Sequence, residues 1–435
     1  MANPRVLVIA EAANPEWVSV PLVGWYIATS LRDVANVHIV TQIRNREAFL
    51  RSGLIEGVDF TAIDSEAIAA PFYRLAERLR GGSGKGWTTL TAMQSLTYPY
   101  FEHLVWKRFG EQIKAGVFDI VHRVTPLSPT SPSSLARRCK KIGVPFMLGP
   151  LNGGLPWPKG FTEDRVRERE WLSFVRGAYA LLPMVASTYK HAEAVIVGSH
   201  HTERELAHYG ASSVYIPENG IDSKKFRSRN NSAQEAPTIK AVFVGRLVPY
   251  KGADLAMRSC AELAAQGMLT LDIVGDGPEM GALQELCDQL GLRKSIKFHG
   301  WLSHADVGEQ LSNADLLVFP SIREFGGGVV LEAMASGVVP VVVDYGGPGE
   351  LVTADCGVKV HLGAKDQIVT QISNALRDLC LSPRDLARMR QNAQNRIATH
   401  YTWNAKAKQI RKIYDWILSG DKHQPAPSFE FFGGD

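Results

Sequence analysis

The feature of this sequence that most constrains its fold is a repeated alternation of short apolar runs with segments of helical spacing. Short runs rich in Val, Ile, Leu and Phe fit strands that are buried on both faces. In the first half these runs lie at 5–10, 38–41, 118–122, 145–148 and 194–197, and helical segments between them include 21–31, 101–115 and 133–141. Strands that alternate with helices predict a parallel sheet covered on both faces.

The same alternation begins again after a polar stretch at 228–235, whose composition is that of a solvated linker. The apolar runs of the second half lie at 241–244, 270–274, 296–298, 315–319 and 339–343. The sequence therefore predicts an α/β protein with two Rossmann-like, doubly wound domains, at 1–227 and 236–402. Ligands of such sheets bind beyond the carboxyl ends of the strands, so we expect a cleft between the domains, lined by the loops that follow the strands.

The C-terminal region continues with apolar residues at helical spacing in 403–418. We expect this helix to pack back on the first domain. The tail beyond Asp421 contains Pro and Gly, and we expect it to be frayed.

Composition and charge narrow the class of protein. The chain has 435 residues, of which 45% are hydrophobic and 21% charged, as is typical of packed soluble proteins. The formal net charge of +4 does not by itself indicate a nucleic-acid partner. The five cysteines have no C-x-x-C spacing, so neither a disulfide framework nor a zinc site is indicated, and a reducing compartment fits best.

Membrane-related signals are few. The N-terminus lacks a basic region before its apolar run, so no signal peptide is indicated. The apolar stretch 171–187 is interrupted by Arg176, and we expect a buried helix there. Basic residues cluster at 137–141, and 106–109 mixes Lys and Arg with Trp and Phe. These clusters fit either docking on anionic lipid or ordinary solvated helix faces. We expect a cytoplasmic protein with a possible peripheral contact to the inner face of the membrane.

Two cations follow the first strand of the second half, in the loop 244–252. Arg246 and Lys251 lie on one turn, and Gly245 and Gly252 allow close backbone approach. Arg binds phosphate oxygens in a planar, bidentate way and Lys adds a point charge. The loop predicts a diphosphate site, although surface charges at a strand end are the alternative.

A second loop, 320–332, leaves a strand, passes through Gly326, Gly327 and Gly328 and enters a helix. Backbone N–H groups at a helix N-terminus suit an anionic or hydroxyl-rich ligand. Glu324 and Glu332 flank the glycines, and two carboxylates beside a phosphate site are expected to face sugar and ribose hydroxyls. The alternative for Glu332 is a structural carboxylate near a helix N-terminus.

These motifs together resemble the retaining GT-B glycosyltransferases of glycosyltransferase family four, the glycogen-synthase-like group. The matching segments, in order over nearly all of 236–351, are Gly245–Leu247, Lys251–Gly252, Val274–Pro278, Phe298–Gly300, Glu324 to Glu332, and Gly346–Glu350. One detail departs from the family pattern. Phe325 comes one residue earlier than the aromatic of the family, and three glycines follow it.

The resemblance implies roles for these residues. Arg246 and Lys251 bind the donor diphosphate, Glu324 with the backbone at Gly326 and Gly327 holds the donor hexose, and Glu332 takes the ribose hydroxyls. Phe325 and Gly328 belong to the same donor-binding loop.

The first half matches the family less closely. Gly24 resembles a remnant of the glycine pair that approaches the phosphates near the first helix. The family often has His-x-His after the fourth strand, and here His122 remains while Val124 replaces the second histidine. The resemblance implies that His122 contacts the reacting sugar, and a purely structural histidine is the alternative.

The function predicted from the sequence is transfer of a hexose from a nucleoside-diphosphate sugar, with retention, to a glycan or lipid-linked acceptor, as in polysaccharide biosynthesis. No cofactor is expected beyond the donor. No Asp-x-Asp occurs in the chain, so no metal site is expected. A nucleoside-diphosphate-sugar epimerase or a phosphorylase of similar shape, and a catalytically degenerate sugar-binding protein, remain as alternatives.

Overall fold

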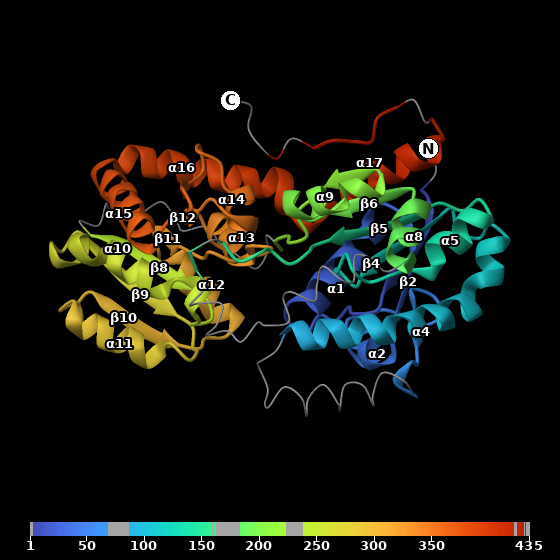
Figure 1. Ribbon diagram of the computed structural model, residues 1–435, viewed down its shortest axis with the longest axis horizontal. Coiled ribbons are helices and arrows are strands. Elements are labelled where there is room, and N and C mark those ends of the chain that lie inside the picture. Colours follow the sequence, from blue (N-terminus) through green and yellow to red (C-terminus); the bar gives the residue numbers. More distant parts are fainter. Residues whose placement is uncertain are drawn as a thin grey trace. The chain divides into compact units, whose positions relative to one another are not determined.

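The computed structural model describes residues 3–67, 87–158, 160–161, 183–222, 238–421, 424–429 and 431 (Figure 1). The chain divides into two compact units. Unit 1 comprises Met1–Gly153, Glu170–Glu218 and Trp403–Phe429, and unit 2 comprises Gly154–Arg169, Asn219–Thr402 and Glu430–Asp435. The predicted linker at 228–235 and most of the apolar stretch 171–187 lie outside the described residues.

Unit 1 contains a parallel sheet that has seven strands within the described residues, in the order β3-β2-β1-β4-β5-β6-β7. Its strands are β1 (Arg5–Ala10), β2 (Asn36–Gln42), β3 (Phe60–Ile63), β4 (Ile120–Thr125), β5 (Phe146–Leu151), β6 (Ala194–Val197) and β7 (Ser213–Tyr215). Its helices are α1 (Val20–Ser30), α2 (Arg46–Arg51), α4 (Trp87–Lys114), α5 (Ser134–Lys141), α8 (Pro183–His191), α9 (His200–Leu206) and α17 (Trp403–Ser419). The order confirms a doubly wound, Rossmann-like sheet.

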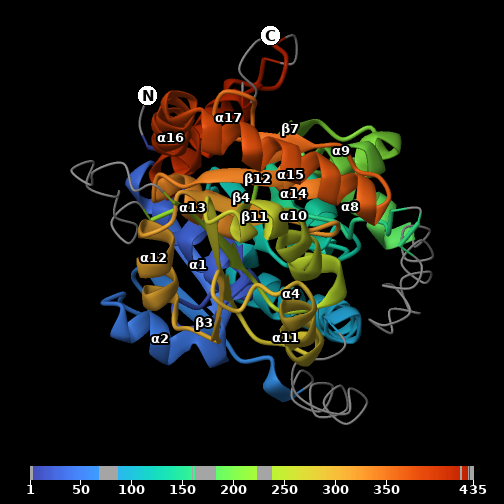
Figure 2. The ribbon, with the colours of Figure 1, turned by 90° about the vertical axis from the view of Figure 1, so that its left-hand side faces the viewer.

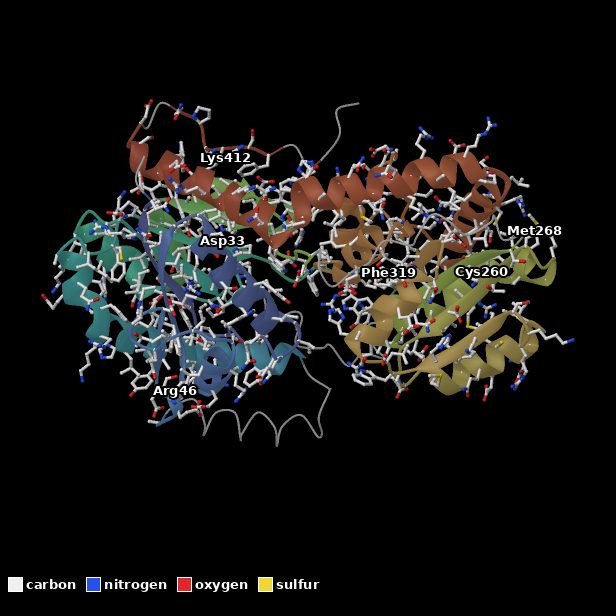
Figure 3. All side chains as sticks on the ribbon, turned by 180° about the vertical axis from the view of Figure 1, so that it is seen from behind. Asp33, Arg46, Cys260, Met268, Phe319 and Lys412 are labelled. Carbon is white, nitrogen blue, oxygen red and sulfur yellow. The ribbon has the colours of Figure 1, made fainter. Side chains whose placement is uncertain are left out.

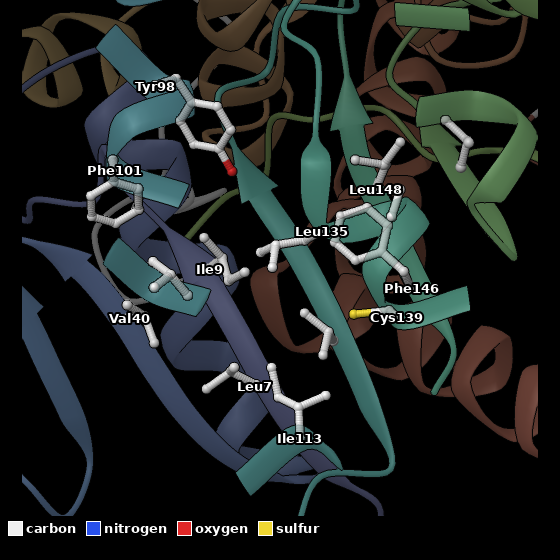
Figure 4. Close-up of a cluster of buried hydrophobic side chains, with 14 of the residues drawn as sticks. Leu7, Ile9, Val40, Tyr98, Phe101, Ile113, Leu135, Cys139, Phe146 and Leu148 are labelled. Carbon is white, nitrogen blue, oxygen red and sulfur yellow. The ribbon is translucent and has the colours of Figure 1, made fainter. Parts of the chain in front are cut away.

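The core of unit 1 follows from the pleat of its strands. Leu7 and Ile9 of β1 point to the face covered by α4 and α5, where they pack with Tyr98, Phe101 and other buried side chains (Figure 4). The opposite face is covered by α1 and α17, which pack against each other. The helix predicted at 403–418 is therefore α17, and it packs in unit 1 as expected.

Unit 2 contains a second parallel sheet, with six strands among the described residues in the order β10-β9-β8-β11-β12-β13. Its strands are β8 (Ile239–Val244), β9 (Leu269–Val274), β10 (Ile296–Gly300), β11 (Leu316–Phe319), β12 (Val339–Val343) and β13 (Val358–Val360). Its helices are α10 (Ala253–Ala265), α11 (Met280–Gln289), α12 (His304–Ser312), α13 (Gly328–Ala335), α14 (Gly346–Leu351), α15 (Lys365–Leu381) and α16 (Pro383–Arg396). Figure 2 shows α12 and α13 on one side of β11 and β12, and α10 and α11 on the other.

The unit boundaries differ from the predicted domains in two places. The main segment of unit 2 begins at Asn219, where Ile221 pairs with Thr402 as a parallel bridge and its N–H donates to the carbonyl of Tyr401, 2.8 Å away. Segment Gly154–Arg169, which we placed in the first domain, belongs to unit 2. Its described residues contact the loops that follow β11 and β12.

The tail beyond Asp421, which we expected to be frayed, lies partly outside the described residues, but its residues 424–429 and 431 make contacts with the rest of the chain. The indole N–H of Trp416 donates to the carbonyl of Gln424 at 3.0 Å. In unit 2, Phe431 is fully buried against the rings of His400 and Tyr401. A hydrogen bond and aromatic contacts thus attach the described residues of the tail, although its Pro and Gly content indicates a coil.

No helix in the described part of the chain combines the length and the apolar character needed to span a bilayer. Cys139, Cys260, Cys287 and Cys356 are buried, Cys380 is half-buried, and all five are free thiols.

Candidate active site

The loops that follow four strands of unit 2 are joined into one surface by backbone hydrogen bonds. The N–H of Gly275, after β9, donates to Gly300 O at the end of β10 (2.8 Å), and the N–H of Leu247, after β8, donates to Asp276 O (2.9 Å). The N–H of Ile322, after β11, donates to Tyr250 O (2.9 Å). The motifs recognised in the sequence therefore lie on one edge of the sheet, at the carboxyl ends of the strands.

Glycine at position 275 is required by this close approach. Its φ of +140° is rarely adopted by residues with side chains, and a Cβ there would overlap the carbonyl of Gly245. The loop after β8 can thus lie directly against the loop after β9.

Lys251 and Glu324 form an ion pair across this edge. Their side chains are 17% and 19% exposed, and the ammonium lies 5.2 Å from the ring centroid of Phe319, the last residue of β11, which is labelled in Figure 3. Arg246 is exposed and has no ion-pair partner within the described ranges. The structure therefore brings Lys251, predicted for the diphosphate, together with Glu324, predicted for the hexose, and places Arg246 on the same loop as Lys251.

The glycine loop ends at the N-terminus of α13. Gly327 precedes the helix with φ of +56°, and Gly328 is its first residue. A Cβ at Gly327 would approach Leu351 of α14 to 2.9 Å, so this position favours glycine for both conformation and space. The ring of Phe325 is half-buried, and the Arg323 guanidinium lies 5.6 Å from its centroid. The helix dipole favours negative charge beside this loop.

Glu332 lies one turn into α13 with a side chain that is 20% exposed. Burial raises the pKa of its carboxyl to about 7. Nε2 of His304, the first residue of α12, lies 3.7 Å from Oε1 of Glu332. Because this carboxyl is partly exposed and lies next to the segment that follows β10, it can exchange hydrogen bonds with the hydroxyl groups of a ligand.

Sequence reasoning did not single out Trp301 or His304. Trp301 follows β10 directly and is 77% exposed, on the same segment as His304. The signal in the sequence was a large aromatic residue immediately after the Phe298–Gly300 motif. Its exposure is known only from the structure.

His122 lies in the core of unit 1. It is fully buried on β4, its Nε2 lies 2.8 Å from Gly149 O, and its Nδ1 lies 2.7 Å from the Tyr414 hydroxyl on α17. Because a carbonyl only accepts, Nε2 carries the proton and Nδ1 accepts from Tyr414. Burial lowers the pKa of His122 to about 4, so the ring is neutral. Both ring nitrogens have partners inside the fold, which fits the structural alternative.

Gly24 lies inside α1 and not at the N-terminus of that helix. A Cβ there would overlap the carbonyl of Ala12, so glycine lets α1 pack against the segment after β1. The residue before α1 is Ser19, which has φ of +65°. The conformation that favours glycine at this helix start is therefore at Ser19, five positions before the glycine that we singled out.

Parts of the chain are similar to known proteins. Residues 224–396 match the sequence model of the family described as glycosyl transferases group 1. An uncharacterised glycosyltransferase of Methanocaldococcus jannaschii is 27% identical over 241 residues, 52% of this chain and 61% of that protein. The glycogen synthase of Mycobacterium tuberculosis is 27% identical over 225 residues, 51% of this chain and 53% of the synthase. The chain thus spans little more than half the length of these relatives.

Among solved structures, the Anabaena protein HepE in complex with UDP and glucose has a TM-score of 0.57 at 18% identity, covering 96% of this chain and all of that one. This likeness concerns the fold alone. Two Rossmann-like units that each carry a parallel sheet form the GT-B architecture, which confirms the predicted fold class. The family match and the named relatives support the prediction of a glycosyltransferase.

Proposed function

We propose that this protein transfers a hexose from a nucleoside-diphosphate sugar to a glycan or a lipid-linked acceptor, with retention and without a metal ion or other cofactor. The observation that carries the proposal is the ion pair between Lys251 and Glu324, on loops of unit 2 that also carry the exposed Arg246. The edge of the sheet formed by these loops also holds the glycine loop and the N-terminus of α13. The family match over 224–396 covers all of these residues.

The Lys251–Glu324 ion pair provides a way to receive the donor. A diphosphate brings negative charge that competes with the Glu324 carboxylate for the Lys251 ammonium. Once Lys251 turns to the phosphate oxygens, Glu324 is released to accept hydrogen bonds from hexose hydroxyls. Arg246 adds a second cation, and together they stabilise the charge that grows on the departing diphosphate.

The remainder of the donor extends over neighbouring groups. Glu332 accepts hydrogen bonds from the ribose hydroxyls. The exposed indole of Trp301 provides a flat surface for the nucleobase, on the segment that also carries His304. Retention follows by resemblance to family four, with the acceptor attacking on the face from which the diphosphate leaves. HepE, whose structure contains UDP and glucose, shows the class of ligand that this fold holds in another protein.

The test is the variant Glu324→Gln, assayed with a panel of nucleoside-diphosphate sugars. Transfer should fall by at least about 100-fold, the cost of losing roughly 3 kcal/mol of transition-state stabilisation. The nucleoside diphosphate should still raise the melting temperature, because Arg246 and Lys251 remain. Glu285→Gln, an exposed change on α11, is the matched control. Unchanged turnover in Glu324→Gln would contradict the assignment.

The acceptor side involves unit 1, and we propose a peripheral contact with the cytoplasmic membrane face through α4 and α5. Lys107, Arg108, Arg137, Lys140 and Lys141 are exposed there. The ring of Trp106, on α4, lies 5.1 Å from the Arg138 guanidinium on α5, so the two helices present their cations together. Phe109 is buried and belongs to the core instead. A basic surface of this kind attracts anionic lipid.

A further inference from the structure

The segment Gly154–Pro158, which leaves β5, docks on the donor loops of unit 2. The carbonyl of Leu155 accepts a hydrogen bond from Arg323 Nε at 3.2 Å. The carbonyl of Pro156 accepts one from the Tyr345 hydroxyl at 2.8 Å. The Leu155 side chain occupies the space where a Cβ of Gly346 would lie. Three contacts made by Leu155 and Pro156 therefore fix this segment beside the loop that carries Glu324.

Trp157, the next residue, contacts side chains from two loops of unit 2. Its ring meets the Tyr250 ring edge to face, with centroids 6.0 Å apart and planes at 90°. The Arg323 guanidinium lies 5.0 Å from the centroid of the Trp157 ring and 5.6 Å from the centroid of the Phe325 ring. Arg323 is only 6% exposed, and cation–π contacts strengthen when the cation is desolvated.

The two neighbours of Trp157 each adjoin a residue of the proposed donor site. Tyr250 immediately precedes Lys251, and Arg323 immediately precedes Glu324. The backbones of the two loops are joined by the bond from Ile322 N–H to Tyr250 O. That bond joins their main chains, so the packing of Tyr250 and Arg323 against Trp157 acts on the same two loops that carry Lys251 and Glu324.

We propose that Trp157 is a positioning residue of the donor site, which holds Lys251 and Glu324 in register by packing between Tyr250 and Arg323. The inference rests on the proposed function for the roles of Lys251 and Glu324. Residues just before this segment are held in unit 1, where Asn152 Nδ2 donates to Glu218 Oε1 (2.6 Å) and Gly153 N–H donates to Thr202 Oγ1 (2.8 Å). The donor site is thus completed by a segment that precedes the second domain in the sequence.

The test compares Trp157→Ala, Trp157→Phe and the control Trp416→Ala, a half-buried tryptophan of α17 in unit 1. In Trp157→Ala we expect kcat/KM for the donor to fall about 30-fold, equivalent to about 2 kcal/mol. Donor hydrolysis without acceptor should fall in parallel, and the acceptor KM should stay within about twofold, as for loss of an interaction at the donor alone. Trp157→Phe should recover most of the loss because a ring remains between Tyr250 and Arg323. Trp416→Ala should leave every kinetic constant unchanged.

A binding measurement separates this inference from the proposed function. UDP, GDP and ADP are titrated by calorimetry, and the nucleotide that binds the wild type should bind Trp157→Ala about tenfold more weakly and Trp157→Phe almost normally, since one decade is about 1.4 kcal/mol. If the wild type binds a nucleotide without transferring sugar, the proposed function fails while this comparison still decides the role of Trp157. Wild-type binding and kinetics in Trp157→Ala would overturn the inference. So would a defect confined to the acceptor KM, or equal losses in the Ala and Phe variants.

Discussion

Replacing Glu332 by glutamine should stabilise the protein at alkaline pH and weaken the binding of the donor. The reason lies in the burial of the carboxyl on α13, which raises its pKa from 4.5 to about 7. A group whose pKa is raised in the folded state contributes stability below its unfolded pKa, and that stability is lost as the pH rises through the folded pKa. The free energy of unfolding should therefore fall between about pH 4.5 and about pH 7 because of this one group.

The size of the effect follows from the pKa values. One pKa unit corresponds to about 1.4 kcal/mol, so the change from 4.5 to about 7 amounts to about 3 kcal/mol at pH 8. Glutamine has nearly the same shape and never ionises. The difference in unfolding free energy between Glu332→Gln and wild type should hence be about 3 kcal/mol larger at pH 8 than at pH 4.5.

Urea unfolding at pH 4.5 and pH 8 measures this difference, with Glu285→Gln as the control for an exposed glutamate. Glu332→Gln and the protein that keeps Glu332 are both studied in the background of His304→Gln. The imidazole of His304, 3.7 Å from Glu332, would otherwise add its own titration. The same variant should raise the donor KM at pH 8 about tenfold, with kcat changed less than threefold, since ribose contacts differ little between ground and transition states. A stability difference that is the same at both pH values would refute the reasoning about burial.

The remaining predictions concern the metal, the buried histidine and the membrane. Transfer should survive excess EDTA almost unchanged, and Arg246→Ala with Lys251→Ala should abolish it without rescue by Mg²⁺ or Mn²⁺; loss of activity in EDTA that either ion restores would show that the diphosphate site is misread. His122→Ala should lower the unfolding free energy by roughly 2 to 4 kcal/mol, because it leaves a cavity and an unpaired Tyr414 hydroxyl, while the folded fraction keeps its kcat; normal stability with lost turnover would return His122 to the active site. The protein should sediment with anionic vesicles at low salt and be released at high salt, since exposed charges are screened within roughly 10 Å at 0.1 M, and Lys140→Glu with Lys141→Glu should weaken that binding.

Much of the fold could be predicted because its determinants are local. Runs such as 5–10 and 339–343 are β1 and β12, since a strand buried on both faces must be apolar throughout. The strands that the sequence did not predict, β3, β7 and β13, are all at sheet edges. An edge strand is short and partly exposed, so it lacks a continuous apolar run.

The donor loops could be predicted for a related reason. Glycines and charged residues that follow a strand within a few positions necessarily lie at the carboxyl end of the sheet, so Arg246, Lys251 and Glu324 could be expected on one edge from chain order alone. The contacts between these side chains could not be predicted. The Lys251–Glu324 ion pair depends on the two loops lying side by side, which only the tertiary structure shows.

Three features were decided by tertiary structure alone. Gly154–Pro158 joins unit 2, although it follows a strand of unit 1, because its partners Arg323 and Tyr345 lie more than a hundred residues further along the chain. His122 is a core residue whose ring is hydrogen-bonded to Tyr414 of α17, 292 positions away in the sequence. The pKa of Glu332 is set by the burial that packing imposes, which no local pattern reports. Local sequence determines which residues can form a strand, a helix or a tight turn. Burial and contacts between residues far apart in the sequence exist only in the folded tertiary structure.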